Sequence, residues 1–158
     1  MRVAILSVFL ALSGLISSSV ASDLDGLYDV GEYSVLDARQ AFKVTVGQAQ
    51  DGEMQIRVAI APGYYLYRDK IRVYAEGGTV GPLKMPPART LDTPGFGAEA
   101  VYEGNVVLPL QQLEIPRGGE AVLHVRTQGC HVQAGVCYPP LTQKFKVRHS
   151  HILRSPGA

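Results

Sequence analysis

Short runs of alternating apolar and polar residues recur along this chain, and they constrain its fold more than any other feature. Phe42, Val44 and Val46 are separated by polar residues, and the run 54–60 repeats the pattern. Further β-branched and aromatic runs lie at 65–73, 101–108, 122–125 and 145–147. A period of two, with glycine- and proline-containing turns between the runs, is typical of strands with one buried face. About seven such strands in one small domain predict an all-β antiparallel sandwich.

Two stretches depart from this alternation. Residues 34–40 hint at a helical turn. The range 85–97 holds three prolines and two glycines, so we expect a long exposed loop with no regular ladder. Phe96 stands between two of these glycines and places an apolar ring on a backbone that can act as a hinge.

The amino-terminal residues indicate export. Arg2 is followed by an uncharged apolar run, and Ser19-Val20-Ala21 supplies the small residues that a signal peptidase reads, so 1–21 is predicted to be a cleaved signal peptide. A membrane anchor is the weaker alternative, because serines and a glycine interrupt a run already short for spanning a bilayer. We expect one exported domain over 22–148 and a flexible tail over 149–158.

The charge balance excludes some partners. The chain has 15 basic and 14 acidic residues and no basic stripe, so nucleic acid is not an expected partner. An oxidising compartment, in contrast, allows cysteines to pair.

Cys130 and Cys137 are the two cysteines of the chain, and they share one short segment. They can serve as a redox switch, as a structural staple or, with His131, as part of a metal site. Closing so short a loop restrains the unfolded chain by only about 2.5 kcal/mol, which is a weak reason for a staple. A metal site is disfavoured because no fourth ligand is local. On the residues alone, a structural disulfide and a redox pair remain equal alternatives, and no cofactor is expected.

Two motifs resemble a known family. The segment from Gln128-Gly129-Cys130 to Cys137-Tyr138-Pro139-Pro140, together with Gly63-Tyr64-Tyr65-Leu66-Tyr67-Arg68, resembles the N-terminal periplasmic domain of the thiol:disulfide interchange protein DsbD. The resemblance extends over roughly 27–147. It implies an immunoglobulin-like sandwich with a cysteine-bearing active-site hairpin and a cap loop.

The resemblance also implies an activity and its partners. The domain would be a periplasmic thiol-disulfide oxidoreductase of the protein-disulfide reductase type. It would receive electrons from a membrane or thioredoxin-like donor and pass them to thioredoxin-fold proteins that isomerise disulfides or mature cytochrome c. A non-catalytic exported binding module with a structural disulfide is the alternative. We expect a monomer.

The resemblance also implies roles for individual residues of this chain. Cys137 would form mixed disulfides with partners, and Cys130 would resolve them. Phe96 would be the aromatic tip of the cap, and Tyr65, Tyr67 and Tyr138 would shield the pair. Tyr65 and Tyr67 are two residues apart, so on a strand they face the same side, although two core aromatics would do the same.

The chain also departs from the family pattern. Six residues separate its cysteines, where the family has five, and Thr93-Pro94-Gly95 replaces the usual acidic and phenylalanine residues of the cap. His131 can stabilise a thiolate if it is protonated, but an exposed histidine without this role is the simpler interpretation. Arg68 and Asp69 are expected at a solvated strand end. Because the chain ends at Ala158 without a membrane or thioredoxin-like domain, we expect an excised domain or a separately encoded relay.

Overall fold

A computed structural model describes residues 27–30, 33–93 and 97–148 of the chain. The expected signal peptide, the tail 149–158 and Phe96 lie outside these residues. Over the described ranges strands are the predominant element, the two helical turns are short, and every pairing between strands is antiparallel.

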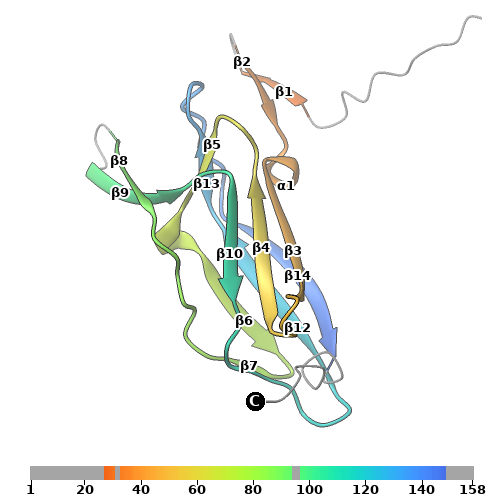
Figure 1. Cartoon of the computed structure of the whole chain (residues 1–158). Coiled ribbons are helices and arrows are strands. Elements are labelled where there is room, and N and C mark those ends of the chain that lie inside the picture. The colour runs from red at the N-terminus through yellow and green to blue at the C-terminus, as the bar shows by residue number, and fades with distance from the viewer. Residues whose placement is uncertain (1–26, 31–32, 94–96, 149–158) are drawn as a thin grey trace, which may run out of the picture.

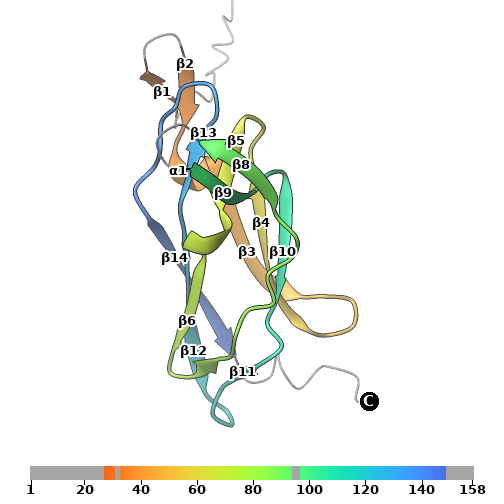
Figure 2. The ribbon, with the colours of Figure 1, turned by 90° about the vertical axis from the view of Figure 1, so that its left-hand side faces the viewer.

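Two three-stranded sheets form the layers of a sandwich, as Figures 1 and 2 show from two sides. The first layer, in spatial order, is β10 (Asn105–Pro109), β4 (Met54–Ile60) and β3 (Phe42–Gln48). The second layer is β14 (Leu141–Arg148), β12 (Glu120–Thr127) and β6 (Arg72–Glu76). The predicted antiparallel β-sandwich of immunoglobulin-like type is confirmed.

Alternation along the strands builds the core between these layers. Ile56, Val58 and Leu108 from the first layer and Leu123 and Val125 from the second are each at most 1% exposed and belong to one apolar cluster. Burying each such side chain stabilises the fold by about 1.5–3 kcal/mol. Polar neighbours such as Arg57 and Arg126 point to solvent, as the period of two requires.

A four-stranded sheet extends the second layer at one end of the sandwich (Figure 1). Its order is β13 (Gly129–His131), β5 (Tyr64–Tyr67), β9 (Gly97–Tyr102) and β8 (Arg89–Thr93). The 3-10 turn η1 (Arg68–Lys70) leads from β5 into β6, and β12 runs through Gln128 into β13. The strand that carries Cys130 is therefore a direct continuation of a core strand.

Two small pairs of strands complete the described fold. They are β1 (Leu27–Val30) with β2 (Tyr33–Leu36), and β7 (Thr79–Val80) with β11 (Leu113–Glu114).

The expected helical turn is present but displaced. It is α1 (Ala38–Ala41), whereas Ser34 to Leu36, which the prediction included, belong to β2. The Asp37 side chain caps the turn by accepting a hydrogen bond of 2.8 Å from the Arg39 N–H. Because the cap is at position 37, the helix starts after it and not at 34.

The prediction of a loop without a ladder over 85–97 is wrong. Arg89–Thr93 forms β8 and pairs along its length with β9, from Arg89 opposite Val101 to Thr93 opposite Gly97. Proline disrupts a ladder only where it stands, and Pro86, Pro87 and Pro94 lie outside these five residues.

Within the described ranges, no helix has the length and apolar character needed to cross a membrane.

Candidate active site

Cys130 and Cys137 are joined by a disulfide with an S–S distance of 2.00 Å and a Cα–Cα distance of 4.0 Å. They face each other as an isolated antiparallel bridge. The His131 N–H donates to the Val136 carbonyl at 2.8 Å, and the Tyr138 N–H donates to the Gly129 carbonyl at 3.0 Å. These flanking bonds place the cysteines at a non-hydrogen-bonded pair, which is the position where opposed side chains of a hairpin come closest.

The two sulfur-bearing residues differ sharply in accessibility. Cys130 is 1% exposed and packs with Tyr65 and Val101 in a small cluster of its own, whereas Cys137 is exposed. An incoming thiol can therefore reach Cys137 from solvent, while Cys130 lies behind it.

Tyr65 and Tyr67 form a hydrogen-bonded pair beside Cys130. Their rings are perpendicular with centroids 5.3 Å apart, and their hydroxyl oxygens are 3.3 Å apart. The Tyr67 oxygen is 3.4 Å from the Cys130 Sγ. Because a disulfide sulfur carries no hydrogen, the Tyr67 O–H is the donor in this contact. The predicted common face of the two tyrosines is confirmed.

The Tyr67 phenol keeps its proton at neutral pH. Burial raises the pKa of Tyr67 from 10.0 to about 12. A donor therefore stays aimed at the buried sulfur over the whole physiological range.

Tyr138 lies on the other face of the hairpin. Its ring meets Phe42 edge-on at 5.5 Å, and its hydroxyl donates to the Leu36 carbonyl at 2.6 Å. Burial raises the pKa of Tyr138 above its usual value. Successive residues of a strand point to opposite faces, so Tyr138 faces the main core while Cys137 faces away from it. These contacts anchor the second arm of the hairpin.

His131 belongs to the framework of the turn. Its Nδ1 accepts a hydrogen bond of 2.9 Å from the Ala134 N–H, and its ring packs edge-on against Tyr64 at 4.7 Å. It is half-buried, and alternation directs it away from the sulfurs. The Ala134 N–H thus uses the ring of His131 as an acceptor within the turn. Gly135, at φ 62°, turns the chain back toward Cys137.

Gly129 is required by a close approach of backbone and side chains. A Cβ at this position would lie 2.7 Å from Phe42 Cζ and 2.9 Å from Leu66 Cδ2, and it would collide with the Tyr65 carbonyl oxygen. Sequence reasoning included this glycine in the motif without finding its role, because the contacts come from β3 and β5.

The strands that flank the expected cap lie in the cysteine-bearing sheet. Leu91 of β8 packs against the cluster of Tyr65, Val101 and Cys130. Leu91 and Val101 were not predicted as site residues, since nothing local in the sequence marks them. Phe96 itself lies outside the described residues, so its covering role stays a prediction.

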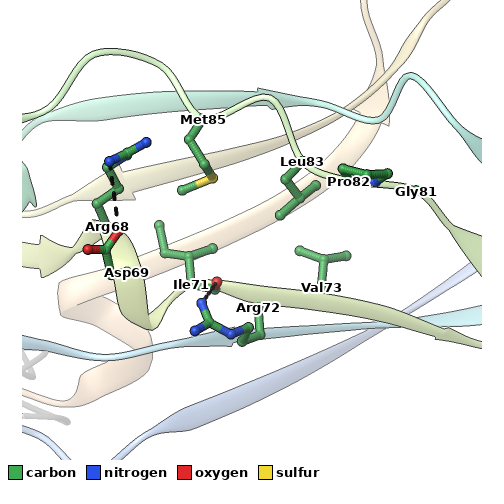
Figure 3. Close-up of a pocket in the computed structure, with 9 residues that line it drawn as sticks. All are labelled: Arg68, Asp69, Ile71, Arg72, Val73, Gly81, Pro82, Leu83 and Met85. Carbon is green, nitrogen blue, oxygen red and sulfur yellow. Dashed lines mark hydrogen bonds and ion pairs between the residues drawn. The ribbon is translucent and has the colours of Figure 1, made fainter.

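A separate hollow of about 410 Å³ lies between β6 and the segment 81–85. Figure 3 shows Leu83 and Met85 facing Ile71 and Val73 across it. Arg68 and Asp69 form a long, exposed ion pair of 3.8 Å at its rim, in agreement with the solvated position expected for them.

In the described part of the chain, no group of three or more metal-ligating side chains is present.

Comparison with known proteins decides the family. The family model "Thiol:disulfide interchange protein DsbD, N-terminal" matches residues 32–149. The chain belongs to the DsbD N-terminal family. It is 34% identical to thiol:disulfide interchange protein DsbD 2 of Pseudomonas aeruginosa over 90% of its length and 32% identical to DsbD of Escherichia coli over 86%. It spans only 23% of the length of each of these relatives.

Solved structures of DsbD N-terminal domains agree with the fold. The reduced N-terminal domain of Neisseria meningitidis DsbD has a TM-score of 0.61 and 27% identity, with 72% of this chain and 90% of that one covered. The same neisserial domain in complex with the PilB N-terminal domain has a TM-score of 0.57 and 27% identity, with 71% and 86% covered.

We expect Gly129→Ala to lower the free energy of unfolding by about 1–3 kcal/mol, because the added methyl group meets backbone and ring atoms that have little room to move. Urea unfolding of the oxidised protein measures this change. Gly47→Ala is the matched control, since no atom lies within 4 Å of a Cβ at that position in β3. Equal stability of Gly129→Ala and wild type would refute the close packing.

Tyr67→Phe should raise the pKa of the Cys130 thiol in the reduced domain by about one to two units. A hydrogen bond to a charged group contributes about 1.5–3 kcal/mol, and 1.36 kcal/mol corresponds to one unit. A titration followed by the Cys130 ¹³Cβ chemical shift measures it. Tyr74→Phe is the control, because Tyr74 is 51% exposed and stacks on His124 instead. The hydrogen bond has no role if both variants titrate like wild type.

Proposed function

We propose that this chain is a periplasmic thiol-disulfide interchange domain that passes reducing equivalents to thioredoxin-fold proteins through a reversible Cys130–Cys137 disulfide. The observation that carries the proposal is the unequal exposure of the two cysteines: Cys137 is exposed and Cys130 is 1% exposed. An interchange site needs one reachable sulfur and a second thiol close behind it to resolve the mixed disulfide.

The exchange proceeds in two balanced steps. In the reduced domain, the Cys137 thiolate attacks a sulfur of the partner's disulfide, forms a mixed disulfide and releases the partner's other sulfur as a thiolate. The Cys130 thiolate then attacks the Cys137 Sγ, forms the internal disulfide and releases the second partner thiolate. Two electrons pass to the partner, and the released thiolates take up protons from solvent. A donor dithiol reloads the domain by the reverse sequence.

Tyr67 acts on the buried sulfur in both directions. When a donor thiolate attacks Cys137, Cys130 leaves as a thiolate 3.4 Å from the Tyr67 oxygen, whose O–H stabilises the developing charge. Tyr65 orients Tyr67 through the contact of 3.3 Å between their hydroxyls. Together these rings form one wall of the site, and Phe96, which lies between β8 and β9 in the sequence, is the aromatic residue that we expect to shield it. Tyr138 supports the hairpin from the core side and takes no part in covering the sulfurs.

Membership of the family supports a proposal for the compartment and the partners. The relatives are named thiol:disulfide interchange proteins, and the neisserial neighbour was solved in complex with the PilB N-terminal domain, which supports a protein as the exchange partner. We place this domain in the periplasm after cleavage of residues 1–21. Its acceptors would be disulfide isomerases and cytochrome c maturation proteins, and its donor a membrane or thioredoxin-like domain.

Single-cysteine variants test the direction of exchange. Reduced Cys130→Ser is mixed with a thioredoxin-fold protein that keeps one active-site cysteine, present as a mixed disulfide with a small aromatic thiol. A disulfide between the two proteins should accumulate through Cys137 as the small thiol is released, because neither protein then holds a second thiol that can resolve it. Cys137→Ser should accumulate little, since its remaining thiol is buried. Non-reducing gel electrophoresis and mass spectrometry measure both products.

The reduction potential separates a relay from a structural bridge. The potential of the Cys130–Cys137 pair, measured against glutathione, should lie within reach of thioredoxin-type proteins, at about −270 mV or above. A structural disulfide would lie below about −300 mV. A potential in that lower range, together with no trapped partner in either variant, would refute the interchange function.

A further inference from the structure

The outer face of the sheet β14-β12-β6 carries several cations at the end nearest the disulfide. The odd-numbered residues 121–125 of β12 pack in the core, so alternation places His124 and Arg126 on the outer face. Arg72 of β6 lies directly opposite Arg126, and Lys144 of β14 lies opposite His124. Cross-strand partners share one face of a sheet. Because the side chains of Arg72, Arg126 and Lys144 are all exposed, we call these three residues the basic face.

Neighbouring carboxylates do not neutralise the basic face. On the same side of the sheet, Glu76 and Glu120 lie toward the end away from the cysteines. Glu76 interacts with His124 at 3.3 Å, and Glu120 pairs with Arg148 at 2.6 Å. Among the described residues, no carboxylate lies within ion-pairing distance of the basic face. Three positive charges next to the site are therefore available to a partner.

The two arginines of the basic face repel each other. Like charges directly opposite in a sheet are destabilising, and Arg72 and Arg126 occupy such a position. The nearest acidic residue along the chain, Asp69, lies 3.8 Å from Arg68 and forms its ion pair there. The whole chain has 15 basic and 14 acidic residues, so this excess of positive charge is a local property. An anionic group from outside the chain would relieve the repulsion.

The basic face continues into the reactive site. β12 runs through Gln128 into β13, as Figure 2 shows. Thr127 and Gly129 are buried, so Arg126 and Cys130 lie on the same face of one continuous strand. Four residues of a strand span about 14 Å. One side of a standard protein–protein interface is about 800 Å², so a single partner can cover both the disulfide and the basic face.

An exposed aromatic ring beside the arginines favours a protein over a lipid surface. Tyr74 is 51% exposed, and its ring stacks on the buried His124 with centroids 4.5 Å apart and an interplanar angle of 17°. Tyrosine and arginine are both enriched in protein–protein interfaces. A membrane lying on this face would also cover the adjoining hairpin and restrict access to Cys137. A protein that reacts with Cys137 would contact the face in the course of exchange.

We propose that the basic face docks an acidic patch of the exchange partner, next to the partner's reactive cysteine. This inference rests on the proposed function and specifies the chemistry of the partner's surface. Arg72 and Arg126 can each bind a carboxylate through two parallel N–H donors. Attraction between such complementary charges mainly accelerates the encounter and is screened by salt.

Oxidation of the reduced domain by charged disulfide peptides tests the basic face. Two synthetic peptides carry the same disulfide loop, followed by a glutamate tail in one and a glutamine tail of equal length in the other. At low ionic strength the glutamate peptide should react about tenfold faster, because the basic face attracts its tail. About 1 M salt should abolish the difference, since the screening length then falls to about 3 Å. Acid quenching and mass spectrometry measure the rate constants.

Matched double variants locate the effect. Arg72→Gln with Arg126→Gln should lower the rate with the glutamate peptide to that with the glutamine peptide. Lys43→Gln with Arg57→Gln removes the same charge from the exposed face of β3 and β4 and should keep the preference. Because the arginines repel each other, the first variant should unfold at no lower urea concentration than wild type. If it unfolds earlier, Lys144→Gln replaces it and should reduce the preference.

The remaining outcomes separate the basic face from the function. Equal rates with both peptides at low salt, or a preference that survives in Arg72→Gln/Arg126→Gln, would leave the interchange function standing and refute the acidic partner. Without a peptide preference, sedimentation of wild type but not of this variant with phosphatidylglycerol vesicles would assign the face to lipid and refute the proposal. If the domain reacts with neither peptide and Cys130→Ser forms no protein adduct, the proposed function fails and the docking surface fails with it.

Discussion

The antiparallel pairing of Cys130 with Cys137 is the constraint on which the rest of the site depends. Because the pair occupies a non-hydrogen-bonded position, its Cα atoms approach to 4.0 Å and the sulfurs can bond across the hairpin. The same pairing sends the backbone of Cys130 into the sheet and the backbone of Cys137 to its edge. The accessible sulfur therefore lies on the outer arm of the hairpin.

The hairpin has two faces with different functions. On the core face, Tyr138 packs on Phe42, and Gly129 lets the hairpin lie against Phe42 and the Tyr65 carbonyl without a Cβ between them. On the other face, Tyr65 and Tyr67 surround the buried sulfur with an apolar wall and one hydroxyl donor. The Cys130–Cys137 disulfide, which must open and close during exchange, thus lies in a hairpin that packing holds in place.

Particular elements show how far the sequence predicts this structure. The alternation in 42–46 and 54–60 correctly identified β3 and β4, because a strand with one buried face has a local signature. The same reasoning fails over 85–97, because the prolines there flank the paired residues of β8 and do not interrupt them. Six residues separate the cysteines, and the positive φ of Gly135 and the hydrogen bond from the Ala134 N–H to the His131 ring close the turn that they form.

The sequence by itself determined the strand pattern, the presence of two nearby thiols and the motifs that mark the family, since each is written in consecutive residues. Only the tertiary structure decided which sulfur is buried and which tyrosine hydroxyl reaches it. Those properties arise where β5, β9 and β13 meet, and these strands are brought together by packing and by pairing across long separations in the chain. A local pattern can predict that a strand exists, but the environment of its side chains depends on neighbours that the pattern does not contain.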